Sequence, residues 1–182
     1  MKILVLGVGG IGGFFGSHLH NVGEDVTFLV RKKRKLDIKK NGIRIKSKYG
    51  NLMIHPNLIT KEKLTPIYDI ILLTCKSYDL TQVINDLAKI KNNGLIIPFL
   101  NGKTHLEKLD KYFNKKNVYG GVAYISSNLD NHGIINHVGQ NMKIAFGSRF
   151  EKNSNLIKDF YNRCKKTKFH SALSNDINQE IW

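Results

Sequence analysis

The sequence is poor in proline and cysteine and holds no long hydrophobic run. Only 3 prolines interrupt its 182 residues, and its 2 cysteines, Cys75 and Cys164, have neither CxxC spacing nor the density of a secreted disulfide scaffold. The apolar start of the chain contains several glycines and no signal-peptide cleavage site, and nowhere do about 18 apolar residues follow one another. We therefore expect a cytoplasmic protein without a membrane-spanning helix.

Acidic residues are also scarce. The chain has 14 Asp and Glu against 29 Lys and Arg, which gives a formal net charge of +15. The basic residues are scattered and no nucleic-acid recognition motif accompanies them, so we expect no nucleic-acid partner and keep a basic nucleic-acid-binding protein as the weakest alternative. A lysine-rich solvated surface that attracts phosphorylated small molecules explains the charge better.

The first 30 residues have the pattern of a βαβ unit. Residues 2–6 (KILVL) form an apolar, β-branched run typical of a strand buried on both faces of a sheet. Glycines follow, residues 11–21 have helical apolar spacing, and residues 25–30 (DVTFLV) predict the next strand. This segment indicates the start of a doubly wound fold.

Strands and helices continue to alternate along the chain. Strands are predicted at residues 69–74, 95–100, 117–125 and 169–172, and helices at 80–90, 106–113 and 156–165. Residues 42–56 and 133–147 each predict a surface hairpin. The pattern predicts an α/β fold, a Rossmann-type, doubly wound and mainly parallel sheet, over residues 1–173.

Residues 174–182 predict the beginning of one more helix. Ser174 or Asn175 could cap it, but a helix of about two turns is not stable alone in water. Its apolar Ile177, Ile181 and Trp182 need a surface to pack on. We expect these residues to be the first turns of a truncated all-helical domain, and we expect uncovered apolar surface to favour self-association or a homo-oligomer.

A glycine-rich motif joins the first predicted strand to the first helix. It fits GxGxxG and consists of Gly7, Val8, Gly9, Gly10, Ile11 and Gly12. The first glycine permits a tight turn, the second lets the backbone approach a pyrophosphate, and the third allows close packing of helix on strand. Free N–H groups at the helix start favour an anion, so the motif predicts a dinucleotide site, with a ligand-free glycine turn as the alternative.

The end of the second predicted strand indicates which dinucleotide binds. NAD enzymes place a carboxylate there for the ribose hydroxyls, whereas this chain has Val30 and Arg31. A planar guanidinium suits a 2′-phosphate, so Arg31 favours NADP(H) over NAD(H). The basic residues 33–35 that follow are interpreted as solvated loop charges.

Two further polar residues follow predicted parallel strands. Lys76 comes after residues 69–74, and Asn101 comes after residues 95–100. Ligands of such sheets lie at the carboxyl ends of the strands, so both residues are predicted to face the cofactor and a small substrate. Lys76 can pair with an anion, and Asn101 can both donate and accept hydrogen bonds. A surface lysine and an Asn-Gly turn are the alternatives.

These motifs together resemble the 2-dehydropantoate 2-reductase (ketopantoate reductase) family. The resemblance rests on GVGGIG at 7–12, Arg31, TCK at 74–76, LNG at 100–102, the GxIxHxG pattern at 133–139 and Glu-Ile-Trp at 180–182. It covers all 182 residues, as the N-terminal domain of that family.

The resemblance implies NADPH-dependent reduction of the 2-oxoacid 2-dehydropantoate to pantoate, a step towards pantothenate and coenzyme A. It implies that residues 7–12 hold the pyrophosphate, Arg31 the 2′-phosphate, and Lys76 and Asn101 the cofactor and substrate cleft, with Ser126 as a further cofactor neighbour. It also places the general-acid lysine just after Trp182, so no catalytic residue is expected within the chain. A non-catalytic NADP(H)-binding module, or a partial gene product, is the main alternative.

Overall fold

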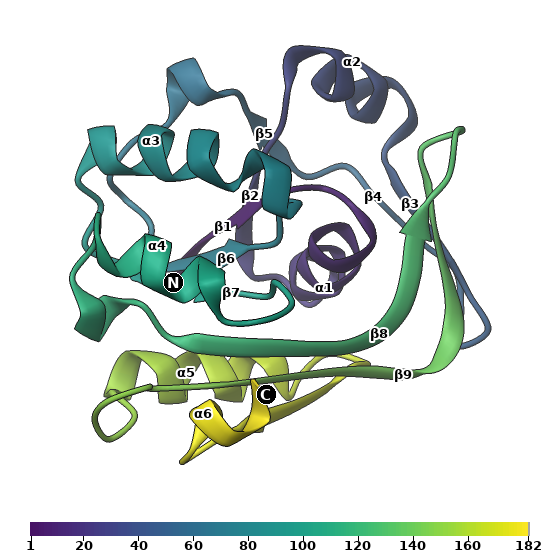
Figure 1. The fold of residues 1–182 in the computed structure, drawn as a ribbon. Coiled ribbons are helices and arrows are strands. Elements are labelled where there is room, and N and C mark those ends of the chain that lie inside the picture. Colours follow the sequence, from purple (N-terminus) through teal and green to yellow (C-terminus); the bar gives the residue numbers. More distant parts are fainter. Residues whose placement is uncertain (182) are drawn as a thin grey trace.

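A five-stranded parallel sheet forms the centre of the structure, a computed structural model that describes residues 1–181. Its strand order is β5-β2-β1-β6-β7 (Figure 1). The strands are β1 Lys2–Leu6, β2 Asp25–Leu29, β5 Asn57–Ile59, β6 Ile70–Leu73 and β7 Leu95–Pro98. The strand order switches sides at β1: β2 and β5 lie on one side of β1, and β6 and β7 lie on the other. This confirms the predicted Rossmann-type fold.

The side chains of β1 alternate between two hydrophobic clusters, as expected for a strand that is buried on both faces. Ile3 and Val5 pack on the face covered by α1 (Gly10–Asn21). Leu4 and Leu6 pack on the opposite face with residues of α3 (Leu80–Ile90) and α4 (Thr104–Asp110). Strand β1 is therefore covered by hydrophobic side chains on both faces of the sheet.

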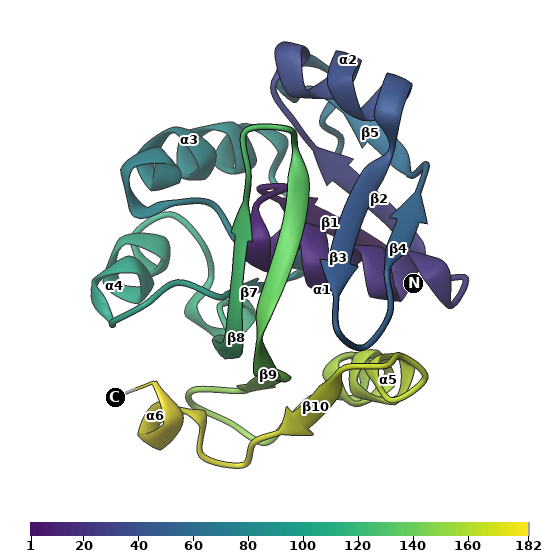
Figure 2. The same cartoon turned by 90° about the vertical axis from the view of Figure 1, so that its right-hand side faces the viewer.

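A second, mixed sheet covers the outer side of α1. Its order is β10-β9-β3-β4, and β8 pairs with β9. Its strands are β3 Ile43–Ser47, β4 Leu52–Ile54, β8 Gly120–Leu129, β9 Ile134–Gly147 and β10 His170–Leu173. Figure 1 shows β8 and β9 as two long curved arms running past α1, and Figure 2 shows β3 and β4 beside them. The antiparallel β3 and β4 confirm the hairpin predicted at 42–56.

The prediction of a hairpin within residues 133–147 is wrong. Those residues form one strand, β9, which is the second arm of a hairpin with β8. The pairing passes from Ile125 opposite Met142 to Ser127 opposite His137, so residues 138–141 lie opposite the single residue Ser126. Residues 138–141 therefore sit in a bulge, which bends a strand without reversing it.

Two elements near the basic segment were not predicted. Residues 33–35, interpreted as loop charges, lie in helix α2 (Lys32–Asn41), whose lysines, arginine and leucine have high helix propensity. Only Ile38 of this helix is buried, so its apolar periodicity is weak. Helix α2 ends at Gly42, which has a φ of 71°. The three-residue β5 was too short to stand out and adds to the edge of the parallel sheet beside β2.

The last described elements pack on the second sheet. Helix α5 (Asn155–Cys164) begins at Ser154, whose hydroxyl accepts a hydrogen bond from the Ile157 amide at 3.4 Å. Helix α6 (Ile177–Glu180) buries Ile177 completely against Gly120 of β8. Trp182, which was also predicted to need a surface to pack on, lies outside the described residues. None of the helices in the described part is long and apolar enough to cross a membrane.

Two buried histidines make the fold sensitive to acid. His18 and His105 are 8% and 4% exposed, and burial lowers the pKa of each to about 4, helped by Lys168 beside His18 and Arg149 beside His105. Each imidazole is therefore neutral in the folded protein but binds a proton below its ordinary pKa when unfolded. The stability they contribute is complete above pH ~6.5 and is lost as the pH falls towards ~4, on the order of 2 kcal/mol for each.

Chemical denaturation between pH 7 and 4 measures this loss. His105→Leu should flatten the dependence of the unfolding free energy on pH, whatever it does to stability at pH 7. The exposed His170, replaced by Gln, is the control and should leave the slope as it is. An unchanged slope in His105→Leu would contradict the assignment.

Candidate functional site

The polar residues singled out in the sequence gather at one edge of the parallel sheet. Leu6 of β1 is aligned with Leu29 of β2 and with Leu73 of β6, and Leu73 is aligned with Pro98 of β7. The segments that follow these strands carry the glycine motif, Arg31, Lys76 and Asn101 in turn. The structure thus brings them to the carboxyl edge, where open α/β sheets bind ligands.

The glycine loop is pressed against the end of β6. Gly7 has a φ of 102°, and a Cβ there would lie 2.9 Å from the Thr74 carbonyl oxygen. A Cβ on Gly12 would lie 2.1 Å from both the Gly7 carbonyl oxygen and Thr74 Oγ1. The Thr74 hydroxyl lies 2.8 Å from the carbonyl oxygens of Leu6 and Gly7, so it can donate to either. Only glycine fits at positions 7 and 12.

The start of α1 is open where the loop meets the helix. Gly9 is the N-cap residue, no side chain of the described residues caps the helix, and its first turn contains no acidic residue. Apart from its chain neighbours, a Cβ on Gly9 would find no atom of residues 1–181 within 4 Å. The first amide N–H groups of a helix have no partner within the helix, so this end can bind an anion. The cradle fits the pyrophosphate of a dinucleotide.

Strand β8 packs against the start of α1 at Gly10. A Cβ on Gly10 would lie 2.4 Å from the Ser127 carbonyl oxygen, so glycine at this position lets β8 cross the helix start. The Ser127 hydroxyl is buried and has no hydrogen-bond partner among residues 1–181. Such an atom suits a ligand at the glycine loop. Sequence reasoning selected Ser126, which is exposed on the neighbouring position of β8; its contact with a cofactor stays a prediction.

Arg31 forms an ion pair across the glycine loop. Its Nη2 atom lies 2.5 Å from Oδ1 of Asp79, the last residue of the short 3₁₀ helix Ser77–Asp79 that follows β6. The Arg31 side chain is 80% exposed and that of Asp79 is 29% exposed. Asp79 was not singled out from the sequence, because nothing local links it to a residue 48 positions away. The guanidinium therefore stands at the site, already paired and still open to solvent.

Lys76 follows β6 and Asn101 follows the neighbouring strand β7, so both come after strands that end at the same edge of the sheet. Both residues are exposed. Lys76 precedes the 3₁₀ helix that carries Asp79. Asn101 precedes Gly102, whose φ of 78° marks a turn that only glycine adopts easily. Their position fits the predicted contacts with cofactor and substrate, which stay predictions.

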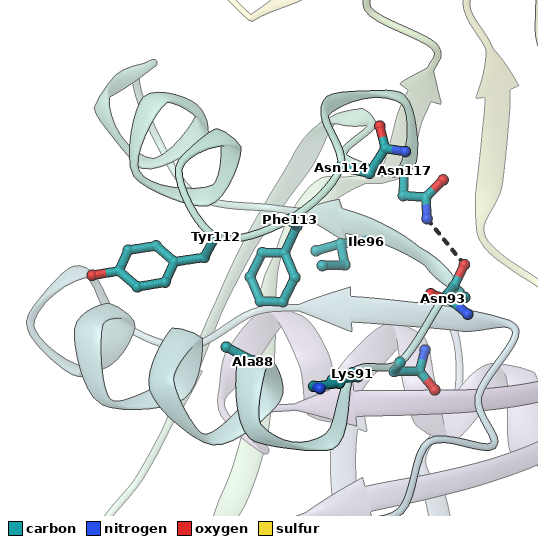
Figure 3. Close-up of a pocket in the computed structure, with 10 residues that line it drawn as sticks. Ala88, Lys91, Asn93, Ile96, Tyr112, Phe113, Asn114 and Asn117 are labelled. Carbon is teal, nitrogen blue, oxygen red and sulfur yellow. Dashed lines mark hydrogen bonds between the residues drawn. The ribbon is translucent and has the colours of Figure 1, made fainter.

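A cavity of about 200 Å³ lies at the opposite edge of the sheet. It is lined by Ala88, Gly94, Ile96 and Phe113, and by asparagines that include Asn117, which donates a hydrogen bond to the Asn93 carbonyl at 3.1 Å (Figure 3). Gly94 immediately precedes β7, which places the cavity at the amino ends of the strands. It is therefore separate from the residues that the sequence predicted.

The described residues contain neither a metal-binding cluster nor an activated cysteine. Among residues 1–181, no group of three His, Cys, Asp or Glu side chains is placed to hold a metal ion. Burial raises the pKa of the Cys75 thiol to about 11, and it also raises the pKa of the fully buried Cys164. Neither cysteine is therefore activated as a nucleophile.

Comparison with known proteins places these features in a family. A model of the family described as ketopantoate reductase PanE/ApbA matches residues 3–150. An uncharacterized oxidoreductase of Bacillus subtilis, YkpB, is 39% identical over 183 aligned positions, which cover 100% of this chain and 60% of that protein. The 2-dehydropantoate 2-reductase of Pyrococcus horikoshii is 29% identical, covering 100% of this chain and 57% of that protein.

Solved structures show the same fold. The 2-dehydropantoate 2-reductase of Geobacter metallireducens superposes with a TM-score of 0.89 at 24% identity, covering 100% of this chain and 60% of that one. A D-mandelate dehydrogenase solved with NADH and anilino(oxo)acetate superposes with a TM-score of 0.87 at 20% identity, covering 59% of that chain. The chain thus spans about three fifths of the length of these relatives. By the match over residues 3–150 and its identity to these relatives, the chain belongs to the ketopantoate reductase PanE/ApbA family.

Proposed function

We propose that the chain binds NADP(H) and forms the cofactor-binding half of a reductase for a small 2-oxoacid, with 2-dehydropantoate as the substrate. The observation that carries the proposal is the open helix start at Gly9, formed by a loop in which positions 7 and 12 admit only glycine. Family membership supports a nicotinamide dinucleotide as the ligand of this loop.

Each part of the cofactor has a group to meet it. The amide N–H groups at the start of α1 would bind the pyrophosphate, and the buried Ser127 hydroxyl would donate to it or to the adjoining ribose. Arg31, exposed at the end of β2, would bind the 2′-phosphate through its planar donor pair. These contacts favour NADPH, because NADH has no charged group to place beside Arg31.

The substrate would lie towards Lys76 and Asn101. The bound nicotinamide supplies the hydride for reduction of a keto carbon. Lys76 would attract the carboxylate of the 2-oxoacid, and the Asn101 amide would hydrogen-bond the nicotinamide ribose or the substrate oxygens. Both exposed side chains follow strands that end at the carboxyl edge of the sheet, which supports this assignment.

Turnover also needs an acid to protonate the developing alkoxide. The family resemblance places that lysine after residues 180–182, so we propose that these 182 residues bind the cofactor without reducing the substrate. A non-catalytic NADP(H)-binding module is the second candidate and shares the same site. The two differ in whether the site acts on a 2-oxoacid when a helical partner domain is supplied.

Mixing experiments separate these candidates. The chain alone should bind NADPH and show no oxidation of NADPH by 2-dehydropantoate. Addition of the part of the Bacillus subtilis relative that this chain does not cover, about two fifths of that protein, should restore turnover if the chain is the cofactor-binding part of a reductase. Turnover by the chain alone would contradict the placement of the proton donor. Binding without turnover in a confirmed complex of the two halves would favour the non-catalytic module.

A further inference from the structure

The ion pair between Arg31 and Asp79 lies near the position proposed for the adenosine ribose. NADPH carries a phosphate on the 2′ oxygen of this ribose, and NADH carries a hydroxyl there. Arg31 leaves β2 and Asp79 follows β6, and these two strands flank β1, which carries the glycine loop. A pair that joins the two flanking segments therefore spans the carboxyl edge above that loop. Any dinucleotide whose pyrophosphate lies at Gly9 must place its adenosine ribose beside one of these segments.

In this ion pair, Asp79 competes with a bound phosphate for the guanidinium of Arg31. The Nη2 atom of Arg31 donates to Asp79 Oδ1 at 2.5 Å, so one edge of the guanidinium is already used before a phosphate arrives. A 2′-phosphate at Arg31 would come close to the Asp79 carboxylate, and like charges repel. A ribose 2′-hydroxyl has the opposite relation to Asp79, because it can donate a hydrogen bond to the carboxylate.

On these grounds, and resting on the proposed function, we propose that Asp79 is a specificity-determining residue that lowers the preference for NADPH and admits NADH. Arg31 attracts the 2′-phosphate, and Asp79 restrains that attraction while offering the acceptor that the ribose hydroxyls of NADH require. The chain therefore has both the basic group typical of NADP enzymes and the acidic group typical of NAD enzymes. Arg31 follows β2, whereas Asp79 follows β6.

The comparison of two charge-matched variants tests this role. Asp79→Asn keeps the size of the side chain and removes its charge. Asp86→Asn makes the same change of net charge on α3, where Asp86 accepts a hydrogen bond from Gln82 rather than from an arginine. The dissociation constants of NADPH and NADH are measured by calorimetry for the wild type and both variants, with thermal unfolding as the check that each is folded.

Asp79→Asn should raise the ratio of the NADH to the NADPH dissociation constant by about five- to tenfold, through tighter NADPH and weaker NADH, because the variant frees Arg31 from its ion pair and replaces a charged acceptor of the ribose hydroxyl by a weaker neutral one. Asp86→Asn should leave the ratio as in the wild type. An unchanged ratio in Asp79→Asn, equal weakening of both cofactors, or a larger loss of NADPH would each overturn the inference. If the wild type binds neither nucleotide, the proposed function itself fails.

Discussion

Replacing Gly9 by Ala is expected to abolish dinucleotide binding while leaving the fold intact. The backbone at Gly9 has a φ of −102° and a ψ of −159°, which any residue adopts, and the new methyl group meets no described atom within 4 Å. That empty space is where the pyrophosphate would approach the helix start. A methyl group there would block several charge-assisted hydrogen bonds, so NADPH should bind about 100-fold more weakly or not at all.

The matched variant Gly12→Ala should behave differently. Its methyl group would lie 2.1 Å from the Gly7 carbonyl oxygen and from Thr74 Oγ1, so the loop or the helix must move. Overpacking of this kind costs about 1–3 kcal/mol, and the melting temperature should fall together with binding. Calorimetry and thermal unfolding of both variants check the contrast. Wild-type affinity in a folded Gly9→Ala would show that the cofactor does not use this loop.

Replacing Arg31 by Ala is expected to weaken NADPH about 10- to 100-fold and NADH by less than about threefold. The difference follows from the loss of charge-assisted hydrogen bonds of roughly 1.5–3 kcal/mol to a 2′-phosphate that NADH does not carry. The loss of the guanidinium also leaves the Asp79 carboxylate without its partner, beside the same phosphate. Both effects oppose NADPH.

Lys33→Ala is the control for Arg31→Ala. Lys33 is exposed on α2, two residues beyond Arg31, and its removal changes the net charge by the same amount. Its effect on NADPH should be small and should disappear at higher salt, because an exposed charge acts only through a screened field. Equal weakening of NADPH and NADH by Arg31→Ala would exclude the phosphate role.

The βαβ unit at the start of the chain could be predicted from the sequence because its signals are local. The strand at 2–6, the glycines and the helix at 11–21 follow one another without interruption, and each has its own periodicity. The parallel sheet then follows from the alternation of strands and helices, which also places Arg31, Lys76 and Asn101 at one edge. These predictions needed no information about distant contacts.

The features that were missed depend on contacts between distant segments. Ser127 lies against Gly10 only because β8 crosses the start of α1, and Asp79 meets Arg31 only because β6 and β2 flank the same strand. The pairing of β8 with β9 is equally non-local, so local pattern did not show that residues 134–147 form one strand with a bulge at 138–141. Sequence periodicity gives elements, whereas these contacts follow from how the elements are stacked.

The most direct measurement is the titration of an isotopically labelled chain with NADPH, followed through its assigned backbone amide signals. We expect the amides of Gly9, Gly10 and Ile11 to shift together with that of Ser127, and those lining the cavity near Asn93 and Phe113 to stay unchanged. Shifts confined to that cavity, with the glycine loop unperturbed, would contradict dinucleotide binding at the glycine loop.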